Sequence, residues 1–131
     1  MNECSIERKI YYHHTDAGGV VYYGTYLQLL EEGRTELCLH AGLDYAGLLS
    51  RGFLFVVVHV EADYKAPARY GDCVAITSNV EKIGRSSVHF CQDICRAGQV
   101  LVRSKVVWVC VSRDTFEPCD VPQDFRAALA G

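Results

Sequence analysis

The sequence predicts an α+β fold in which an antiparallel sheet of about five strands wraps around one long helix. Only one long segment, residues 23–41, shows the three-to-four-residue apolar period of a helix. Four later segments are rich in β-branched and aromatic residues, and the last three are joined by connections too short for helical crossovers. One helix cannot cover such a sheet completely, so we expect a homo-oligomer, a dimer or a tetramer, to cover the remaining face and edges.

The length, charge and apolar runs of the chain indicate a single domain that neither binds nucleic acid nor spans a membrane. With 131 residues it fits a single domain, residues 1–131, because a second core would lack apolar material. Its net charge is -3 and it has no long basic block, so nucleic acid is not an expected partner. The apolar runs at 53–60 and 106–111 are far shorter than the ~20 residues of a transmembrane helix, and the first residues do not resemble a signal peptide. We therefore expect a cytoplasmic protein.

The elements can be placed in order along the chain. Residues 5–12 predict a first strand, which leads to a turn at Gly18 and Gly19. The long helix follows and stops at Gly42, and a short helical turn is expected near residues 45–50. The remaining strands are predicted at residues 53–64, 73–83, 86–96 and 99–112. Residues 113–131 predict turns and a short terminal helix without chemistry of their own.

Neither the cysteines nor the histidines predict a metal site. The seven cysteines are odd in number, irregularly spaced and without a Cys-x-x-Cys pair, which favours reduced thiols. His13 and His14 are adjacent, a spacing unsuited to one ion on a strand. His59 lies in the most apolar strand and is predicted to be a core or pocket-lining residue. No metal or redox cofactor is expected.

The stretch "HHTDAGGVVYYGTY", residues 13–26, contains the strongest candidate for catalysis, Asp16. An aspartate before two glycines is usually a turn residue. The valines and tyrosines that follow are too apolar for a solvated turn, so the loop is expected to enter a pocket or a subunit contact. The helix begins near Tyr23 and Gly24, where unpaired backbone N–H groups can polarise a carbonyl oxygen. A carboxylate beside such donors suits acyl transfer from a thioester, either as nucleophile or as general base.

The same stretch resembles a known family, the hotdog-fold acyl-CoA thioesterases of the 4-hydroxybenzoyl-CoA thioesterase and YbgC-like group. The similarity covers "YYHHTDAGGVVYYGTYLQLLEEGRTEL" and extends through "FVVVHVEADYKAPARYGD", "IGRSSVHFCQDI" and "KVVWVCVSRDTFEP". The resemblance implies a helix wrapped by an antiparallel sheet, dimers with a continuous sheet, and often tetramers. It also implies an acyl-CoA thioesterase that hydrolyses a short-chain or aromatic acyl-CoA and needs no cofactor, since coenzyme A is part of the substrate.

The resemblance also assigns residues to the site. Asp16 corresponds to the catalytic carboxylate, and Tyr12 matches a tyrosine near it in YbgC-like proteins. Tyr23 occupies a position that is histidine in many YbgC-like sequences, so its backbone N–H becomes the candidate for holding the thioester carbonyl. Substrate binding is assigned to the helix start, to aromatic and histidine positions, and to the "GRSS" turn expected to contact coenzyme A. These residues are Gly24, Tyr26, His59, Arg85, Ser86 and Ser87.

Several alternatives stay open on the sequence. Other hotdog thioesterases carry their acid on the central helix, where this chain has Glu31 and Glu32; here we expect them to pair with Arg34 or cap the pocket. A thioesterase for acyl carrier protein would need a basic surface, for which the chain offers Lys65 and several arginines. A non-catalytic acyl-thioester binding protein is the third possibility. The acyl group and the choice between nucleophilic and general-base routes are not determined by residue types.

Overall fold

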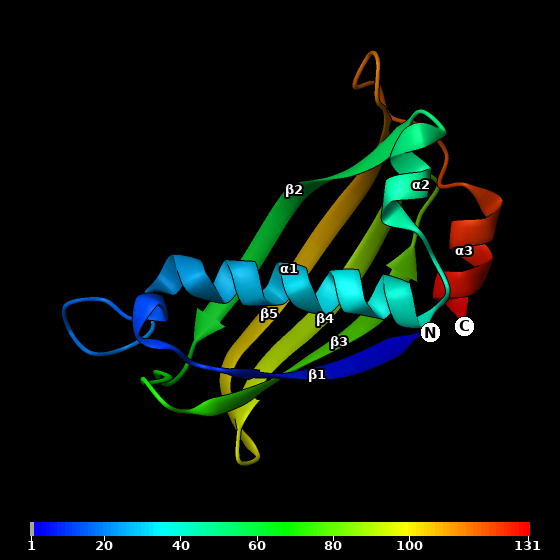
Figure 1. Ribbon diagram of the computed structural model, residues 1–131. Helices are drawn as coiled ribbons and strands as arrows, with labels where there is room; N and C mark the ends of the chain where they lie inside the picture. The colour runs from blue at the N-terminus through cyan, green and yellow to red at the C-terminus, as the bar shows by residue number, and fades with distance from the viewer. Residues whose placement is uncertain (1) are drawn as a thin grey trace.

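The computed structural model describes residues 2–131 and contains one five-stranded antiparallel sheet with the strand order β1-β3-β4-β5-β2 (Figure 1). The strands are β1 (Glu3–Lys9), β2 (Phe53–Tyr64), β3 (Cys73–Ile83), β4 (Ser87–Arg96) and β5 (Gln99–Ser112). The helical elements are η1 (Tyr12–His14), α1 (Tyr23–His40), α2 (Tyr45–Ser50) and α3 (Gln123–Ala130). The predicted α+β arrangement of one long helix and five strands is confirmed.

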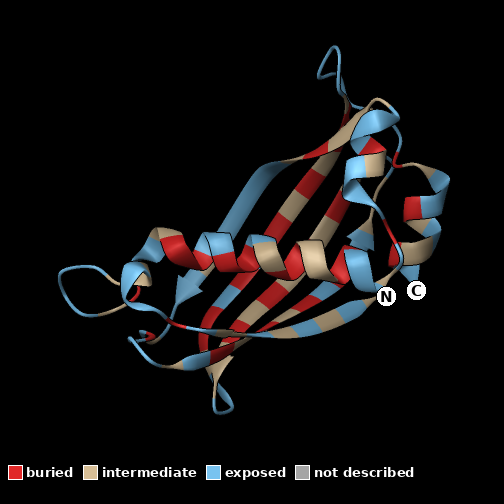
Figure 2. Ribbon diagram, in the orientation of Figure 1, coloured by how far each residue is buried: buried red, intermediate tan, exposed pale blue. Residues whose placement is uncertain are grey.

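Helix α1 crosses one face of the sheet diagonally, and its buried residues form a stripe toward the strands (Figures 1 and 2). The helix approaches the sheet most closely at Gly33. A Cβ atom there would lie 2.7 Å from Ile76 Cγ2 and 2.7 Å from Ser78 Oγ. Only a residue without a side chain fits at this contact, which brings the helical residues on either side of Gly33 close to the sheet.

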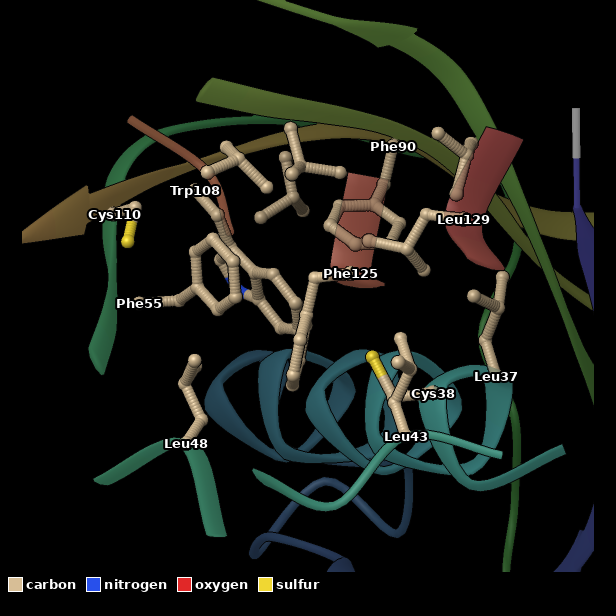
Figure 3. Packing of buried hydrophobic residues seen from close by; sticks show 14 residues of the cluster. Leu37, Cys38, Leu43, Leu48, Phe55, Phe90, Trp108, Cys110, Phe125 and Leu129 are labelled. Atoms are coloured by element: carbon tan, nitrogen blue, oxygen red, sulfur yellow. The ribbon is translucent and has the colours of Figure 1, made fainter. Parts of the chain in front are cut away.

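The apolar core has two parts, one toward each end of α1. Toward the C-terminal end, the Phe55 and Trp108 rings stack at 4.9 Å, with Phe90 edge-on to Trp108 at 4.7 Å and Phe125 of α3 beside them (Figure 3). Toward the N-terminal end, buried aliphatic side chains of α1 meet those of β3, β4 and β5. This second part contains Leu29, Leu30, Val74, Ile76, Ile94, Leu101 and Val102.

The edge strand β2 is less covered than the central strands of the sheet. In the central strands β3 and β4, buried positions alternate with less buried ones, as expected when one face packs on a helix. The second half of the edge strand β2 is mostly exposed, with Val57, Val58 and Val60 exposed by 47%, 56% and 41% (Figure 2). The register of β2 shifts between Val57 and His59, which leaves Val58 as a bulge.

Two sequence predictions differ from the structure. The first strand ends at Lys9 rather than at residue 12, because the chain turns into η1 once Ile10 has bonded to Asp72. His59 is not buried in the core: its side chain is 53% exposed, and its Nε2 lies 2.9 Å from Glu61 Oε1. It does line a pocket, together with His89 of β4 and Lys105 of β5. It is exposed because β2 is an edge strand and His59 points away from α1, on the same side as its cross-strand neighbour Val107.

The other predicted boundaries hold closely. The long helix ends at His40 and Gly42 has a φ of +79°, the left-handed conformation that terminates helices. The predicted terminal helix is α3, and its Phe125 and Leu129 are buried in the core. All seven cysteines are free thiols. Within residues 2–131, no helix combines the length and apolar character needed to cross a membrane.

Candidate active site

The loop between η1 and α1 places Asp16 in a tight turn. The Gly18 N–H donates to Asp16 Oδ1 at 2.8 Å, and the Gly19 N–H donates to the Asp16 carbonyl at 3.0 Å. The turn closes because the Asp16 N–H donates to the Val20 carbonyl at 2.9 Å, with Gly19 at a φ of +77°. Asp16 therefore does stabilise its own turn, as the simplest interpretation of the Asp-Ala-Gly-Gly sequence predicts. One carboxylate oxygen is held by that turn.

The same carboxylate faces a pocket of about 390 Å³ between the loop, the start of α1 and the end of β2. The pocket has an apolar and aromatic lining with one cation. Its residues are Asp16, Val20, Val21, Tyr23, Tyr26, Tyr64, Lys65, Ala66 and Pro67. An exposed carboxylate in a concave, mainly apolar setting has the form of a small-molecule site rather than of an ordinary surface turn.

The N-terminus of α1 is open at this pocket. Tyr22, which precedes the helix, makes no side-chain cap hydrogen bond. Within residues 2–131, the N–H groups of Tyr23 and Gly24 have no hydrogen-bond acceptor, whereas the Thr25 N–H donates to the Tyr22 carbonyl at 2.9 Å. The Tyr22 ring packs over Gly24, so that a Cβ on Gly24 would lie 2.7 Å from Tyr22 Cε2. Two unpaired donors at the positive end of a helix can stabilise a developing oxyanion.

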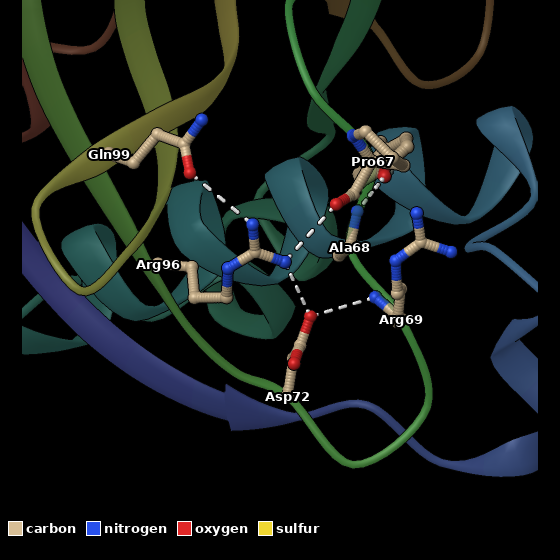
Figure 4. A network of polar contacts seen from close by, with 7 residues as sticks. Pro67, Ala68, Arg69, Asp72, Arg96 and Gln99 are labelled. Carbon is tan, nitrogen blue, oxygen red and sulfur yellow. Dashed lines mark hydrogen bonds and ion pairs between the residues drawn. The ribbon is translucent and has the colours of Figure 1, made fainter.

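The opposite wall is the loop of residues 65–72, which is fixed by a polar network (Figure 4). Arg96 Nη1 donates to Asp72 Oδ2 at 2.7 Å and to the Pro67 carbonyl at 3.2 Å. The Arg69 N–H also donates to Asp72 Oδ2, at 2.8 Å. These hydrogen bonds lower the pKa of the Asp72 carboxyl, and the bond from the Arg69 N–H has the largest effect, followed by that from Arg96. The loop is therefore tied to β4 through Arg96.

Three of the predicted site residues meet in this pocket, Asp16, Tyr23 and Tyr26, and Gly24 lies at the adjoining helix start. Tyr26 is buried and accepts a hydrogen bond from the Ala68 N–H at 2.9 Å, so it forms the floor of the pocket. Tyr12 is not brought into the pocket. Its ring is 79% exposed and lies edge-on to Tyr70 at 6.0 Å.

The remaining predicted residues lie elsewhere in the same chain. His59 is on the face of the sheet away from α1. The turn of Arg85, Ser86 and Ser87 lies beside the segment before α3, where Arg85 forms an exposed ion pair with Asp120 at 2.7 Å. Strand β3 begins near the 65–72 loop and ends at this turn, so its 11 residues separate the turn from the pocket by roughly 33 Å.

The structure also shows contacts that sequence reasoning missed. Tyr64 lines the pocket because it ends β2 with its ring 5.5 Å from that of Tyr26. Neither helix glutamate forms the expected ion pair with Arg34: Glu32 pairs with Arg8 at 2.7 Å, and Glu31 accepts a hydrogen bond from Thr35 at 2.9 Å. Glu31 does line a pocket, together with Arg34, but not the pocket beside Asp16. Arg34 itself is buried. Its position, four residues after Leu30 on the apolar stripe of the helix, was the available signal.

Known proteins are similar to this chain both in sequence and in structure. A family model described as "Thioesterase-like superfamily" matches residues 12–129. The acyl-CoA thioester hydrolase YbgC of Escherichia coli O6:H1 is 33% identical over 120 residues, covering 91% of this chain and 90% of that protein. The acyl-CoA thioesterase YbgC of Haemophilus influenzae is 31% identical over 129 residues, covering 98% and 95%.

A solved structure shows the same fold over nearly the whole chain. The 1,4-dihydroxy-2-naphthoyl-CoA thioesterase Slr0204 from Synechocystis superposes with a TM-score of 0.91 and 26% sequence identity, covering 98% of this chain and 96% of that one. The family model includes the Asp16 loop, α1 and strands β2 to β5, whereas β1 lies outside it. The chain belongs to the thioesterase-like superfamily and has the hotdog fold of these enzymes.

Proposed function

We propose that this protein is an acyl-CoA thioesterase, which hydrolyses an acyl-CoA to the free acid and coenzyme A. The observation that carries the proposal is the meeting of Asp16 and the open N-terminus of α1 in one apolar pocket. The names of its relatives, which include acyl-CoA thioester hydrolases, support the same reaction. The pocket beside Asp16, at about 390 Å³, is of a size for a short acyl chain or a single aromatic ring.

The residues act on the thioester in two ways. The N–H groups of Tyr23 and Gly24 hold the thioester oxygen and stabilise the negative charge that develops on it. Asp16 then either attacks the carbonyl carbon, expelling the thiolate of coenzyme A and leaving an anhydride that water cleaves, or removes a proton from the water that attacks directly. Oδ1 stays bonded to the Gly18 N–H, which leaves Oδ2 for the chemistry. The reaction requires no metal or redox cofactor.

We propose that the working unit is a homo-oligomer in the cytoplasm. The exposed edge of β2 offers unpaired backbone groups flanked by valines, and pairing with the β2 edge of a second copy would extend the sheet. The roughly 33 Å between Arg85 and the pocket supports the same assembly. If Arg85, Ser86 and Ser87 contact coenzyme A, they do so from another copy.

Replacement of the carboxylate tests the proposal. Asp16→Asn should fold normally, because the asparagine oxygen can still accept the Gly18 N–H. Its turnover should fall by roughly 10² to 10⁴, the usual contribution of a positioned acid or base. The measurement is the rate of free coenzyme A release, followed by mass spectrometry because the seven protein thiols interfere with thiol dyes. The substrates are a panel of aliphatic and aromatic acyl-CoAs, with acyl carrier protein thioesters for comparison.

Asp114→Asn is a matched control, since Asp114 is an exposed aspartate in the turn after β5. It should retain the wild-type rate. Wild-type turnover in Asp16→Asn would remove Asp16 from the mechanism, and thioester binding without turnover in the wild type would indicate a binding protein instead.

A further inference from the structure

His14 joins two sides of the candidate active site through its side chain and its backbone. Its Nδ1 accepts the Tyr11 N–H at 2.8 Å, and its own N–H donates to the Tyr11 carbonyl at 3.0 Å. Its carbonyl accepts the Tyr22 N–H at 3.0 Å and the Thr25 hydroxyl at 3.4 Å. These hydrogen bonds close η1 and attach it to the first turn of α1.

The two segments that this histidine joins are themselves fixed in the fold. Tyr11 directly follows Ile10, whose N–H donates to the Asp72 carbonyl at 2.8 Å. Tyr11 is therefore anchored beside the 65–72 loop, which forms the wall of the pocket opposite the start of α1. On the other side, Tyr22 is the residue that directly precedes α1. A bond to each of them connects the two walls of the site.

Asp16 lies in the loop that begins at this connection. The loop is closed by the bridge between Thr15 and Val21 and by the hydrogen bond from the Asp16 N–H to the Val20 carbonyl at 2.9 Å. His14 comes directly before these pairs, and its side chain does not line the Asp16 pocket. Any effect of His14 on the reaction therefore passes through the position of the loop and of the helix start.

Only the neutral imidazole of His14 can make the connection to Tyr11. Because Nδ1 accepts a hydrogen bond, the proton of the neutral ring lies on Nε2. A protonated ring carries a donor on both nitrogens, so the Nδ1–H would face the Tyr11 N–H and the hydrogen bond would be lost. Protonation of the ring and closure of η1 by its side chain exclude each other.

The surroundings of the ring favour its neutral form. Burial lowers the pKa of His14, and the neighbouring His13, whose ring centroid lies 4.1 Å away, lowers it further. Glu32 of α1 raises this pKa, but it is paired with Arg8 of β1 at 2.7 Å. The Tyr11 ring also lies beside the imidazole, with the centroids 5.9 Å apart. Because the pKa lies below the ordinary value of 6.5, His14 gains its charge only in mild acid.

We propose that neutral His14 is a positioning residue of the Asp16 site and that its protonation lowers turnover. In the neutral state, the bond from Tyr11 closes η1 and holds the Asp16 loop against the start of α1. In mild acid the charged ring releases Tyr11, and Asp16 is no longer held beside the N–H groups of Tyr23 and Gly24. This inference rests on the proposed thioesterase function and adds a pH-dependent control to it.

The test is the pH dependence of kcat in the wild type and in two variants. His14→Asn offers an oxygen close to the place of Nδ1 and does not titrate, whereas His14→Leu has no acceptor. The wild-type kcat should fall by roughly 3-fold to 10-fold as the pH decreases from 6.5 through the lowered pKa of His14, the effect of losing one hydrogen bond. His14→Asn should keep the neutral-pH rate without this fall, and His14→Leu should be slow at every pH.

His13→Gln is a matched control in the same turn. It removes the neighbour that lowers the pKa of His14, so the fall in kcat should remain and move to higher pH. An unchanged fall in His14→Asn overturns the proposal, as does the wild-type rate in His14→Leu at neutral pH. If His14→Asn is as slow as His14→Leu at neutral pH, the imidazole does more than accept a hydrogen bond, and the proposal fails as well.

Amide hydrogen exchange separates this proposal from the thioesterase function. The protection of the Tyr11 and Tyr22 amides, relative to their intrinsic exchange rates, should decrease in the wild type over the same pH interval and stay constant in His14→Asn. This comparison remains decisive if His14→Leu does not fold, and constant protection in the wild type overturns the proposal. If the protection changes as expected but no acyl-CoA is hydrolysed in an Asp16-dependent manner, the thioesterase function has failed and the positioning of the loop by His14 stands.

Discussion

At the scale of single residues, Tyr26 connects the start of the helix to the opposite wall of the pocket. Its hydroxyl accepts the N–H of Ala68, a residue with no exposed surface. Tyr26→Phe would leave that N–H buried without an acceptor, so the free energy of unfolding should fall by roughly 1 to 3 kcal/mol. Urea denaturation followed by circular dichroism measures the change. Tyr70→Phe, at a tyrosine that is 63% exposed, should leave stability unchanged; an equal loss in both variants would contradict the role of this hydrogen bond.

A short motif predicts only those properties of a residue that depend on its neighbours in the chain. Asp16, Gly19 and the helix start were recognisable because turn chemistry and an open helix terminus follow from neighbouring residues in the chain. The exposure of His59 was not recognisable, because it depends on which strand forms the edge of the sheet. The direct partners of Glu31 and Glu32 were not recognisable either: they are Thr35 and, across the fold, Arg8 of β1, and not Arg34.

At the scale of elements, the 65–72 loop depends on the ion pair between Arg96 of β4 and Asp72. The hydrogen bond from the Arg69 N–H, and then the pair with Arg96, lower the pKa of Asp72 in the folded state. Both contacts therefore stabilise the protein at a pH above the ordinary pKa of 3.8. This stabilisation is lost as the pH falls from 3.8 through the lowered pKa of Asp72, because the carboxylate is then protonated. Asp72→Asn should therefore be less stable than the wild type near neutral pH, by roughly 1 kcal/mol for a partly exposed pair.

The measurement is urea unfolding of the wild type and Asp72→Asn at a series of pH values. The difference in unfolding free energy between the two should be constant at higher pH and shrink toward zero in acid. A difference that persists below the lowered pKa would mean that hydrogen bonding by the neutral side chain, and not the charge, holds the loop.

At the scale of the whole molecule, the β2 edge is the surface that an oligomer would use. Val58 lies in the bulge of β2 and is 56% exposed. Val58→Lys places a charge on this edge and should convert the assembly into smaller species, because charged side chains oppose edge-to-edge pairing. Light scattering coupled to size-exclusion chromatography measures the mass. Ser5→Lys adds the same charge to β1 at the other edge and should leave the mass unchanged; an unchanged mass in Val58→Lys would exclude pairing through β2.

The sequence by itself determined the number, type and order of the elements, with strand and helix limits within a few residues over most of the chain. It also identified the Asp16 loop, because apolar periodicity and turn chemistry are local properties of the chain. The tertiary structure alone decided the strand order, the exposed β2 edge and the joining of the 65–72 loop to the Asp16 turn. It also decided that Arg34 is buried beside Gln92 and Trp108, because burial and pairing depend on residues far apart in sequence.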